Sequence, residues 1–327
     1  MIDKHGKLKG IKTMKKNIKR ILKFVLGRPY RWLMKDKVWW RKFLSVAAPV
    51  YASKRLYKKA LGRKLNLKNP QTLNEKCMWL KLNTYYRHPL ITECCDKYRV
   101  RDYVKRMGCA EILNDLIGVW DNPDKIDFDK LPNQFVLKCN HGAGFNIICR
   151  DKTKLDISKT KKQLKKWLKE DYWKLYAETQ YKFIKKKIIC EKFLNAGQEN
   201  IPVDYKLYMI NGNFHAIMIC LDRDKDVKFY HFDNNLRYRP DYNSPTLSVL
   251  PTHLTLIPSE INKMIDYAKI LSKPFPFVRV DLYGINGKII FSELTFLVYG
   301  GVFYTRYANL LSNITFTSIP KEYLFTK

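Results

Sequence analysis

The chain has 327 residues, and its 62 Lys and Arg against 30 Asp and Glu give it a formal net charge of +32. Apolar residues make up 46% of the chain, which excludes a disordered protein, and the length suffices for more than one lobe with a buried core. Such a positive field attracts phosphates, nucleic acid, anionic lipid headgroups and acidic polymers alike, so the charge alone selects no partner.

The eight cysteines show no CxxC pair and no Cys/His cluster at zinc-ligand spacing. Most of them lie within apolar stretches, which predicts buried free thiols in a reducing compartment. The N-terminal segment lacks the apolar core and cleavage site of a signal peptide. The longest apolar run, residues 43–52, is far shorter than the roughly 20 residues that span a bilayer. We therefore expect a cytoplasmic protein that is soluble or bound peripherally to a membrane.

Residues 1–53 form the first predicted region, a basic and mainly helical segment. Residues 1–45 hold 15 Lys and Arg against two Asp, with apolar residues spaced to form one stripe along a helix, and aromatic residues follow. A basic helix that ends in Trp side chains suits docking on the anionic inner face of the plasma membrane. The alternative, a solvated basic helix packed against its own domain, stays open. The stripe comprises Ile18, Ile21, Leu22, Val25 and Leu26, and the aromatic residues are Tyr30, Trp32, Trp39 and Trp40.

Residues 54–134 are predicted to be mainly helical, and strand patterns begin at residue 135. Thr72 and Glu75 fit a capping box at the start of one helix. Turn residues such as Asn211-Gly212 indicate tight hairpins between successive strands. The predicted strands cover 135–139, 146–150, 187–193, 204–210, 214–221, 277–283 and 288–294, and the predicted helices lie at 96–107, within 152–187 and at 260–273.

Lys138 ends an otherwise apolar strand and is followed at once by a glycine-containing turn. A lysine in this place either extends to solvent from the strand end or lies in a cleft to meet an anion. Gly142 and Gly144 allow backbone N–H groups to approach phosphate oxygens, while Lys138 supplies a point charge. The combination favours phosphate binding, although glycine hairpins are common. His141 by itself is more typical of a loop residue than of a catalyst.

Asp281 and Glu293 lie on two strands whose other residues are mostly apolar. Carboxylates on half-buried strands cost several kcal/mol unless a cation or a hydrogen-bond donor meets them. A hairpin would bring the two close enough to share Mg²⁺, which prefers carboxylate and phosphate oxygens. The equally weighted alternative is a salt bridge, for example between Asp281 and Arg279 or Lys206.

Two further strands carry charged residues. Glu191 ends a strand and leads into Phe193 and Leu194, a segment against which an adenine could lie. Asp204 and Lys206 lie on the same face of the next strand because side chains alternate along a strand. They form either an internal ion pair or a second basic contact to phosphate or product.

Taken in order, these segments resemble an ATP-grasp enzyme, and most closely the TupA-like ATP-grasp family found with bacterial surface-polysaccharide genes. The resemblance spans residues 65–305 and rests on the order of the segments, since each alone is unspecific. They are NPQTLNEK at 69–76, FVLKCNHGAG at 135–144, ICEKFL at 189–194, DYK at 204–206, and RVD at 279–281 with ELTF at 293–296.

The resemblance implies an α+β protein with the ATP-grasp fold, in which two α+β lobes clasp ATP. Residues 135–193 would form the lid lobe and residues 194–327 the core lobe. Lys138 would contact the α and β phosphates, and the loop at 141–144 would close over them. The adenine would lie against Glu191, Lys192, Phe193 and Leu194.

The core lobe would supply the remaining groups. Lys206 would reach the transferred phosphate, with Asp204 in the same cofactor-binding set. Arg279 would steady an acyl-phosphate or the following tetrahedral oxyanion. Mg²⁺ would be bound by Asp281, Glu293 and Thr295. Many ATP-grasp enzymes have Asn where Thr295 stands, so the chain departs from that pattern at the second metal contact.

The implied chemistry is the ATP-dependent joining of a carboxylate to an amine through an acyl-phosphate, with ATP and Mg²⁺ as cofactors. The genetic setting of the family implies a role in cell-surface polysaccharide or capsule biosynthesis and an acidic sugar or amino acid as substrate.

Two alternatives stay open. A glycosyltransferase of the same pathway would fit the Asp-x-Asp form of Asp222-Arg223-Asp224, whose surroundings indicate a loop. A non-catalytic protein that binds polyanions or membrane would fit the charge. Neither zinc-finger spacing nor a recognition-helix pattern indicates specific nucleic-acid binding.

Overall fold

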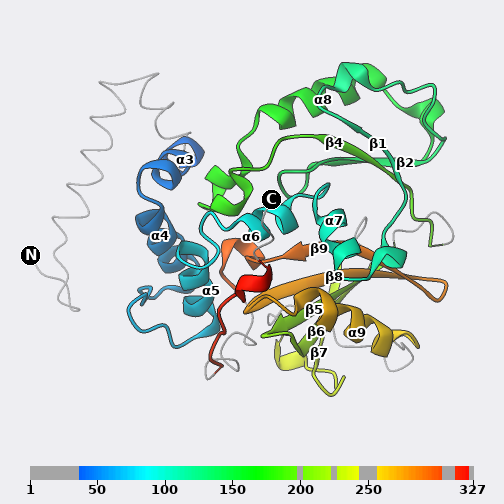
Figure 1. Ribbon diagram of the computed structural model, residues 1–327. Coiled ribbons are helices and arrows are strands. Elements are labelled where there is room, and N and C mark those ends of the chain that lie inside the picture. The colour runs from blue at the N-terminus through cyan, green and yellow to red at the C-terminus, as the bar shows by residue number, and fades with distance from the viewer. Residues whose placement is uncertain (1–36, 197–201, 222–226, 243–255, 304–313, 324–327) are drawn as a thin grey trace, which may run out of the picture.

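The computed structural model describes residues 37–196, 202–221, 227–242, 256–303 and 314–323. Two antiparallel sheets form two lobes, each covered by helices, and a group of helices from the N-terminal part lies beside them (Figure 1). The predicted α+β class is confirmed.

Five helices precede the first strand in the described part of the chain: α3 (Lys37–Ala47), α4 (Pro49–Leu61), α5 (Leu73–Leu82), α6 (Pro89–Cys95) and α7 (Val100–Arg106). The predicted capping box at the start of α5 is confirmed. The Thr72 side chain accepts a hydrogen bond from the backbone N–H of Glu75, and the Glu75 carboxylate accepts one from the N–H of Thr72.

The small sheet has four strands in the order β1-β4-β2-β3, and all its pairs are antiparallel. Its outer face packs against α8 (Ile157–Lys169). On β2, Phe135, Leu137 and Cys139 are buried in this core, while Val136 and Lys138 point to the other face. The strands are β1 (Leu116–Trp120), β2 (Phe135–Cys139), β3 (Asn146–Cys149) and β4 (Ile188–Lys192).

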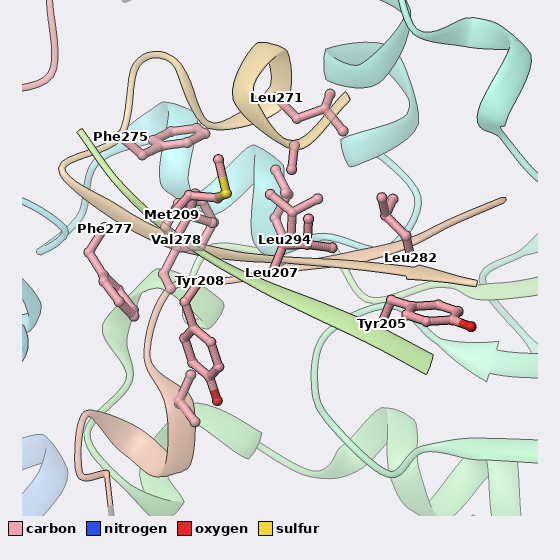
Figure 2. Packing of buried hydrophobic residues seen from close by; sticks show 14 of the residues in the cluster. Tyr205, Leu207, Tyr208, Met209, Leu271, Phe275, Phe277, Val278, Leu282 and Leu294 are labelled. Carbon is pink, nitrogen blue, oxygen red and sulfur yellow. The ribbon is translucent and has the colours of Figure 1, made fainter. Parts of the chain in front are cut away.

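The large sheet has five antiparallel strands in the order β7-β6-β5-β8-β9. Helix α9 (Ile261–Ser272) packs on one face. Figure 2 shows Leu207 and Met209 of β5 near Leu271 of α9, whereas Tyr208 points to the opposite side. The strands are β5 (Val203–Ile210), β6 (Asn213–Leu221), β7 (Lys228–Asp233), β8 (Phe277–Ile285) and β9 (Lys288–Thr295).

Two-residue turns fix the register of two hairpins in the large sheet. Asn211 and Gly212, with φ of 50° and 75°, connect β5 to β6, and Asn286 and Gly287, with φ of 47° and 78°, connect β8 to β9. Positive φ at both positions is the conformation that favours Asn-Gly, so the predicted hairpins are confirmed.

The helix α5 is joined to distant parts of the chain by buried polar contacts. The ammonium of Lys81, which is 1% exposed, donates to the carbonyl oxygens of Tyr176 and Gly300. The Asn74 side chain donates to the carbonyl of Phe303 at 3.2 Å and accepts from its N–H at 2.6 Å. These contacts satisfy buried polar groups and place α5 against the chain that follows β9.

Some predicted elements differ from the structure. The prediction that residues 54–130 are helical is wrong at β1, which is a strand because it pairs with β4. The strand β7 was not predicted either. Of the predicted lysine-rich helical stretch at 152–187, α8 covers only Ile157–Lys169, and short 3-10 turns follow, among them η4 (Tyr172–Leu175). The helix predicted at 96–107 begins only at Val100, in α7.

All eight cysteines are free and buried, as predicted. Within the described residues there is no helix long and apolar enough to cross a membrane. Residues 1–36, which carry most of the predicted basic helix, lie outside the described part of the chain. The division at residues 54, 135 and 194 stays a prediction, and β1 of the small sheet precedes the second of these boundaries.

Candidate active site

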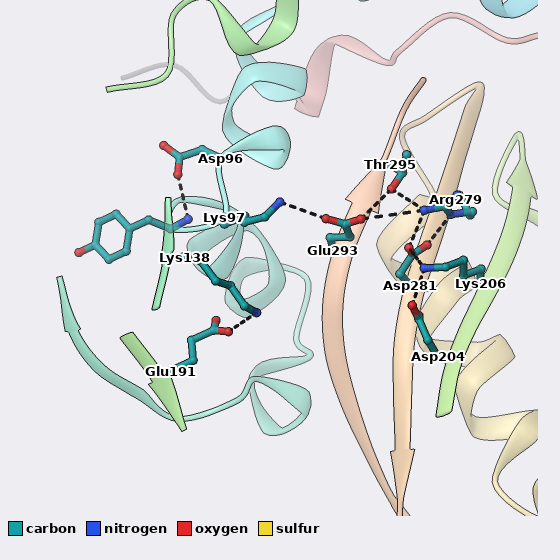
Figure 3. Close-up of polar contacts among 11 residues, drawn as sticks. Asp96, Lys97, Lys138, Glu191, Asp204, Lys206, Arg279, Asp281, Glu293 and Thr295 are labelled. Atoms are coloured by element: carbon teal, nitrogen blue, oxygen red, sulfur yellow. Dashed lines mark hydrogen bonds and ion pairs between the residues drawn. The ribbon is translucent and has the colours of Figure 1, made fainter. Parts of the chain in front are cut away.

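A row of charged residues crosses the large sheet on the face opposite α9. Strand pairing places Lys206 of β5 opposite Asp281 of β8, and Asp281 opposite Glu293 of β9. Arg279 and Thr295 are paired in the same way two residues further along these strands. The row is drawn in Figure 3. It arises because side chains on neighbouring strands that lie opposite each other point to the same face.

Asp281 is completely buried and held by two cations. The Arg279 guanidinium donates to its two oxygens at 2.7 Å each, and the Lys206 ammonium donates at 2.6 Å. Lys206 also lies 2.6 Å from the buried Asp204 carboxylate. The salt bridge of Asp281 that the sequence left open as the alternative to metal binding is therefore present, with both expected partners, and so is the internal pair of Asp204 and Lys206.

Burial and charge act in opposite directions on these groups. Burial alone would lower the pKa of Lys206, but the carboxylates of Asp281 and Asp204 raise it above its ordinary value. In the same way, burial opposes the charge of Arg279, yet Asp281 keeps its pKa raised. Both side chains thus stay cationic on this face of the sheet.

Glu293 lies at the edge of this network and is partly exposed. One oxygen is 3.1 Å from the Lys97 ammonium, and the other is 3.4 Å from the Thr295 hydroxyl and 4.0 Å from Arg279. Burial would raise the pKa of Glu293, but the charges of Lys97, Lys206 and Arg279 hold it well below the ordinary value. Glu293 is therefore ionised in any ordinary buffer.

Lys97 belongs to the connection between α6 and α7, and its side chain reaches the large sheet (Figure 3). Sequence reasoning missed it because one lysine in a chain with 62 basic residues gives no signal. Its backbone is fixed by the glycine loop, since the N–H of Lys97 donates to the carbonyl of Asn140 at 3.2 Å. The buried Asn140 amide also donates to Asp96 at 2.8 Å and accepts from the N–H of Lys187 at 2.7 Å.

On the small sheet, Lys138 and Glu191 form the central contact. Lys138 of β2 lies 2.6 Å from Glu191 of β4, and Arg101 of α7 approaches the other Glu191 oxygen at 3.6 Å. Burial would lower the pKa of Lys138, but the charge of Glu191 leaves it raised, with smaller contributions from Tyr283 and Glu293. Arg101 was not predicted and has no local sequence signal.

A cavity of about 200 Å³ lies beside this pair and is bounded by both lobes. Val136, Ile148 and Phe193 provide apolar surface from the small-sheet side, and Tyr283 of β8 provides a ring from the large sheet. An apolar surface with polar groups converging on it is typical of a small-molecule site. The predicted adenine segment lines it: Glu191, Lys192, Phe193 and Leu194, with Lys138, Asn114, Asn146 and Pro202.

The loop between β2 and β3 packs under α8. The His141 ring is 2% exposed, its Nε2 is 3.1 Å from the carbonyl of Trp167, and it contacts Phe145. Burial lowers the pKa of His141 to about 4. A side chain at Gly142 would collide with the ring of Tyr172, 2.7 Å from the ideal Cβ, and Gly144 has a φ of 75°. His141, Gly142 and Gly144 do not line the cavity, so their predicted contact with phosphate stays a prediction.

The oxygen donors of Asp281, Glu293 and Thr295 fit Mg²⁺ in kind. Within the described residues, however, His, Cys, Asp and Glu side chains nowhere form a group of three that could hold a metal ion. Mg²⁺ that serves nucleotides is commonly bound by one or two carboxylates, with phosphate and water oxygens completing the shell. The pair of carboxylates suffices on that basis, provided that the ion displaces or shares the contacts of Lys97 with Glu293 and of Lys206 and Arg279 with Asp281.

The two antiparallel sheets thus bring Lys138 and a partly apolar cavity to one side of the site and a row of charged strand residues to the other. The sequence identifies the family: residues 75–312 match the model of the TupA-like ATP-grasp family. The chain belongs to this family, and the resemblance noted from its motifs is confirmed, as is the ATP-grasp fold.

Solved structures similar to the chain include ligases and synthetases, whose sequence identity to the chain is low. They include the ADP complex of N5-carboxyaminoimidazole ribonucleotide synthetase (13% identity, TM-score 0.41, 68% of this chain and 50% of that one). D-alanine–D-alanine ligase from Bacillus anthracis has 19% identity and a TM-score of 0.38 over 66% and 61% of the two chains. L-amino acid ligase from Bacillus licheniformis has 14% identity and a TM-score of 0.41 over 70% of this chain and 49% of that one.

At these values the likenesses carry no conclusion about substrate or activity. The chain spans about half to three fifths of the length of these structures. A comparison with curated proteins finds no match.

Proposed function

We propose that the chain is an ATP-dependent carboxylate–amine ligase that forms an acyl-phosphate and releases ADP and phosphate. One observation supports this most directly. Tyr283, Asp281 and Arg279 follow one another on the same face of β8, from the cavity wall to the charged row. Residues two apart on a strand are roughly 7 Å apart, so the order matches a base, a polyphosphate and a reacting anionic group.

In this proposal the adenine occupies the cavity against Phe193, Leu194 and Tyr283. Glu191 and the backbone of Lys192 lie at its polar edge, and Lys138 turns from Glu191 toward the α and β phosphates. The glycine loop at 141–144 and Asp204 complete the nucleotide site. The lysine is positioned for this exchange because its ammonium stays charged beside Glu191.

Asp281, Glu293 and Thr295 are proposed to hold Mg²⁺ together with phosphate oxygens. When bound, the ion would neutralise charge on the phosphates, which is the main requirement of phosphoryl transfer. Lys206 and Arg279 would also neutralise phosphate charge, since both stay protonated in the buried network.

The reaction requires an attack on each of two centres. A substrate carboxylate oxygen bonds to the γ-phosphorus and the bond to ADP breaks; an amine then bonds to the acyl carbon, phosphate leaves and the amine loses its proton. Lys206 would face the transferred phosphoryl group, and Arg279 would stabilise the acyl-phosphate and the oxyanion that follows. No nucleophilic side chain is needed.

The proposed substrates are an acidic sugar, such as a uronic acid in a polymer, or an acidic amino acid, and an amine. The net charge of +32 suits anionic substrates, although it does not distinguish them. The biological setting that we propose is the synthesis of cell-surface polysaccharide or capsule, by analogy with the family.

Calorimetric titration of MgATP tests the proposal. The wild-type chain should bind MgATP tightly and lose most of the affinity when Mg²⁺ is omitted. Glu293→Gln keeps the side-chain shape but removes one negative charge. The increase in ATP affinity that Mg²⁺ produces should therefore be at least tenfold smaller in this variant. Binding would justify a screen of acidic sugars and amines for ADP release.

Glu322→Gln is the matched control, because Glu322 is exposed and is not one of the ion-pair partners of the charged row. It should bind MgATP as the wild type does. Weak binding that is insensitive both to Mg²⁺ and to Glu293→Gln would refute the proposed ligase.

A further inference from the structure

The helices α3 and α4 carry an exposed aromatic surface. Trp39, Trp40 and Phe43 are 49%, 44% and 45% exposed, and their rings contact one another at centroid distances of 5.4 to 6.3 Å. Val38, Val46, Val50 and Tyr51 extend the surface across the turn between the helices. Half of the exposed large hydrophobic side chains of the described chain thus lie between residues 38 and 51. A contiguous patch of this kind marks an interaction site.

All charged residues in the sequence around this surface are basic. Between Asp36 and Glu75 there are ten Lys and Arg residues and no acidic residue. Lys54, Arg55, Lys58 and Lys59 are exposed along α4. The chain as a whole has about two basic residues for each acidic one, so this segment differs from the average surface in lacking any counter-charge.

A cavity of about 200 Å³ lies beside the patch, between α3, α4 and the end of η4, where Leu175 and Tyr176 line it. Its walls combine apolar side chains such as Leu44 and Leu56 with the cations Arg41, Arg55 and Lys59. The Nε of Arg41 is buried and has no hydrogen-bond acceptor among the described residues, while its guanidinium stacks on Tyr176 at 5.1 Å. A buried donor without an acceptor costs free energy, which a bound anion would recover.

We infer that α3 and α4 dock on the surface of an anionic phospholipid bilayer, with one lipid phosphate in this cavity. The aromatic rings would insert at the headgroup level, as Trp and Phe do at such interfaces. Arg41, Arg55 and Lys59 would contact the phosphate, and the exposed lysines of α4 would face the negative surface. Figure 1 shows α3 and α4 (blue) at one edge of the molecule, away from both sheets, so docking would leave the nucleotide cavity uncovered.

The charge pattern favours this occupant over a second copy of the chain. Two such surfaces facing each other would bring only positive charges together. An anionic bilayer instead matches the basic rim and the apolar centre at the same time.

Vesicle flotation with the full chain tests the inference. At about 0.15 M salt, the wild type should float with vesicles of phosphatidylcholine and phosphatidylglycerol. With vesicles of phosphatidylcholine alone it should remain in the bottom fraction. Trp39→Ser with Phe43→Ser should reduce binding at least tenfold by removing the inserted rings. Arg55→Glu with Lys59→Glu should reduce it by about thirtyfold or more, since each basic residue near an anionic surface contributes roughly a factor of five.

The matched control is Lys162→Glu with Lys166→Glu, which makes the same change in net charge on exposed positions of α8. This variant should retain binding within about threefold, because the charge it loses is remote from the surface. Equal loss in the control and the α4 variant would show that overall charge drives binding and would overturn the inference. Circular dichroism of each variant confirms folding.

Three other results would also overturn it. Failure of the folded wild type to bind anionic vesicles would mean that the patch is covered by the chain itself. A dimer in sedimentation that Trp39→Ser with Phe43→Ser converts to monomer, without vesicle binding, would assign the surface to a second copy. Competition by 10 mM orthophosphate, with no effect of the aromatic substitutions, would reduce the cavity to a site for free phosphate.

Discussion

The large sheet and the small sheet carry different kinds of surface. The large sheet carries a chain of opposite charges in which Asp281, fully buried, is held by Lys206 and Arg279. The small sheet contributes Lys138 and Glu191 beside apolar walls, and its loop at His141 is packed among aromatic rings. One surface is organised by charge and the other by packing.

The difference indicates a division of tasks. A fully connected ionic network keeps its side chains in one arrangement and provides fixed charge, which suits a site where phosphate charge must be neutralised. A cavity that combines apolar walls with polar side chains suits recognition of a flat base. Three substitutions with different costs in the free energy of unfolding test whether the surfaces are held together in these different ways.

Asp281→Asn should have the largest effect. It leaves the buried Lys206 and Arg279 without their shared carboxylate, and breaking a buried ionic network in this way costs about 3–5 kcal/mol. Urea denaturation followed by circular dichroism measures the loss. Asp266→Asn makes the same chemical change at an exposed position of the same lobe and should cost less than about 0.5 kcal/mol. Equal stabilities of the two variants would contradict a structural role for the charged row.

His141 should make the small-sheet lobe sensitive to acid. Its pKa is lowered to about 4 by burial, from about 6.5 in the unfolded chain. The unfolded chain therefore binds the proton first, and stability is lost as the pH falls from 6.5 to 4, by up to about 3 kcal/mol. His141→Gln should remove most of this loss of stability between pH 6.5 and pH 4. Above pH 7 it should change the free energy of unfolding by less than about 3 kcal/mol. Denaturation at pH 7.5 and pH 4.5 measures it, and equal slopes for both proteins would contradict the prediction.

Lys97→Met should have the smallest effect on folding. Its ion pair with Glu293 is partly exposed, at 20% and 36% for the two side chains, and pairs of this kind contribute about 1 kcal/mol or less. Lys125→Met removes a more exposed pair with Asp121 and serves as the control. A loss above about 2 kcal/mol for Lys97→Met would mean that the contact between the helices and the large sheet is part of the stability of the fold.

The sequence predicted most of the architecture because its strongest signals are local. The apolar runs bounded by Asn-Gly turns located the strands of the large sheet, and the Thr72 capping box located α5. The strands β1 and β7 were missed because their place in a sheet depends on pairing with β4 and β6, which no local pattern shows. The residues of the charged row were recognised one by one from their own strands, whereas their alignment into one row depends on strand pairing.

Sequence reasoning singled out candidate site residues where a charged residue stands in a distinctive segment. Lys138, Glu191, Asp281 and Glu293 lie on strands with few other charges, and the structure brings the first two together and the second two together. Lys97 lies in the connection between α6 and α7, Arg101 lies in α7, and the surrounding sequence is basic, so only tertiary contacts identify them.

The contacts of α5 bear on the order of events during synthesis. Lys81 donates to Gly300 over 219 residues of sequence, and Asn74 meets Phe303 over 229. The ribosome therefore releases α5 before Gly300 and Phe303 exist, and Lys81 and Asn74 lack these two partners while both sheets are made. Translation past residue 303 is thus the step at which α5 can first make these two contacts, and an arrested chain that ends earlier would leave both polar side chains without these partners.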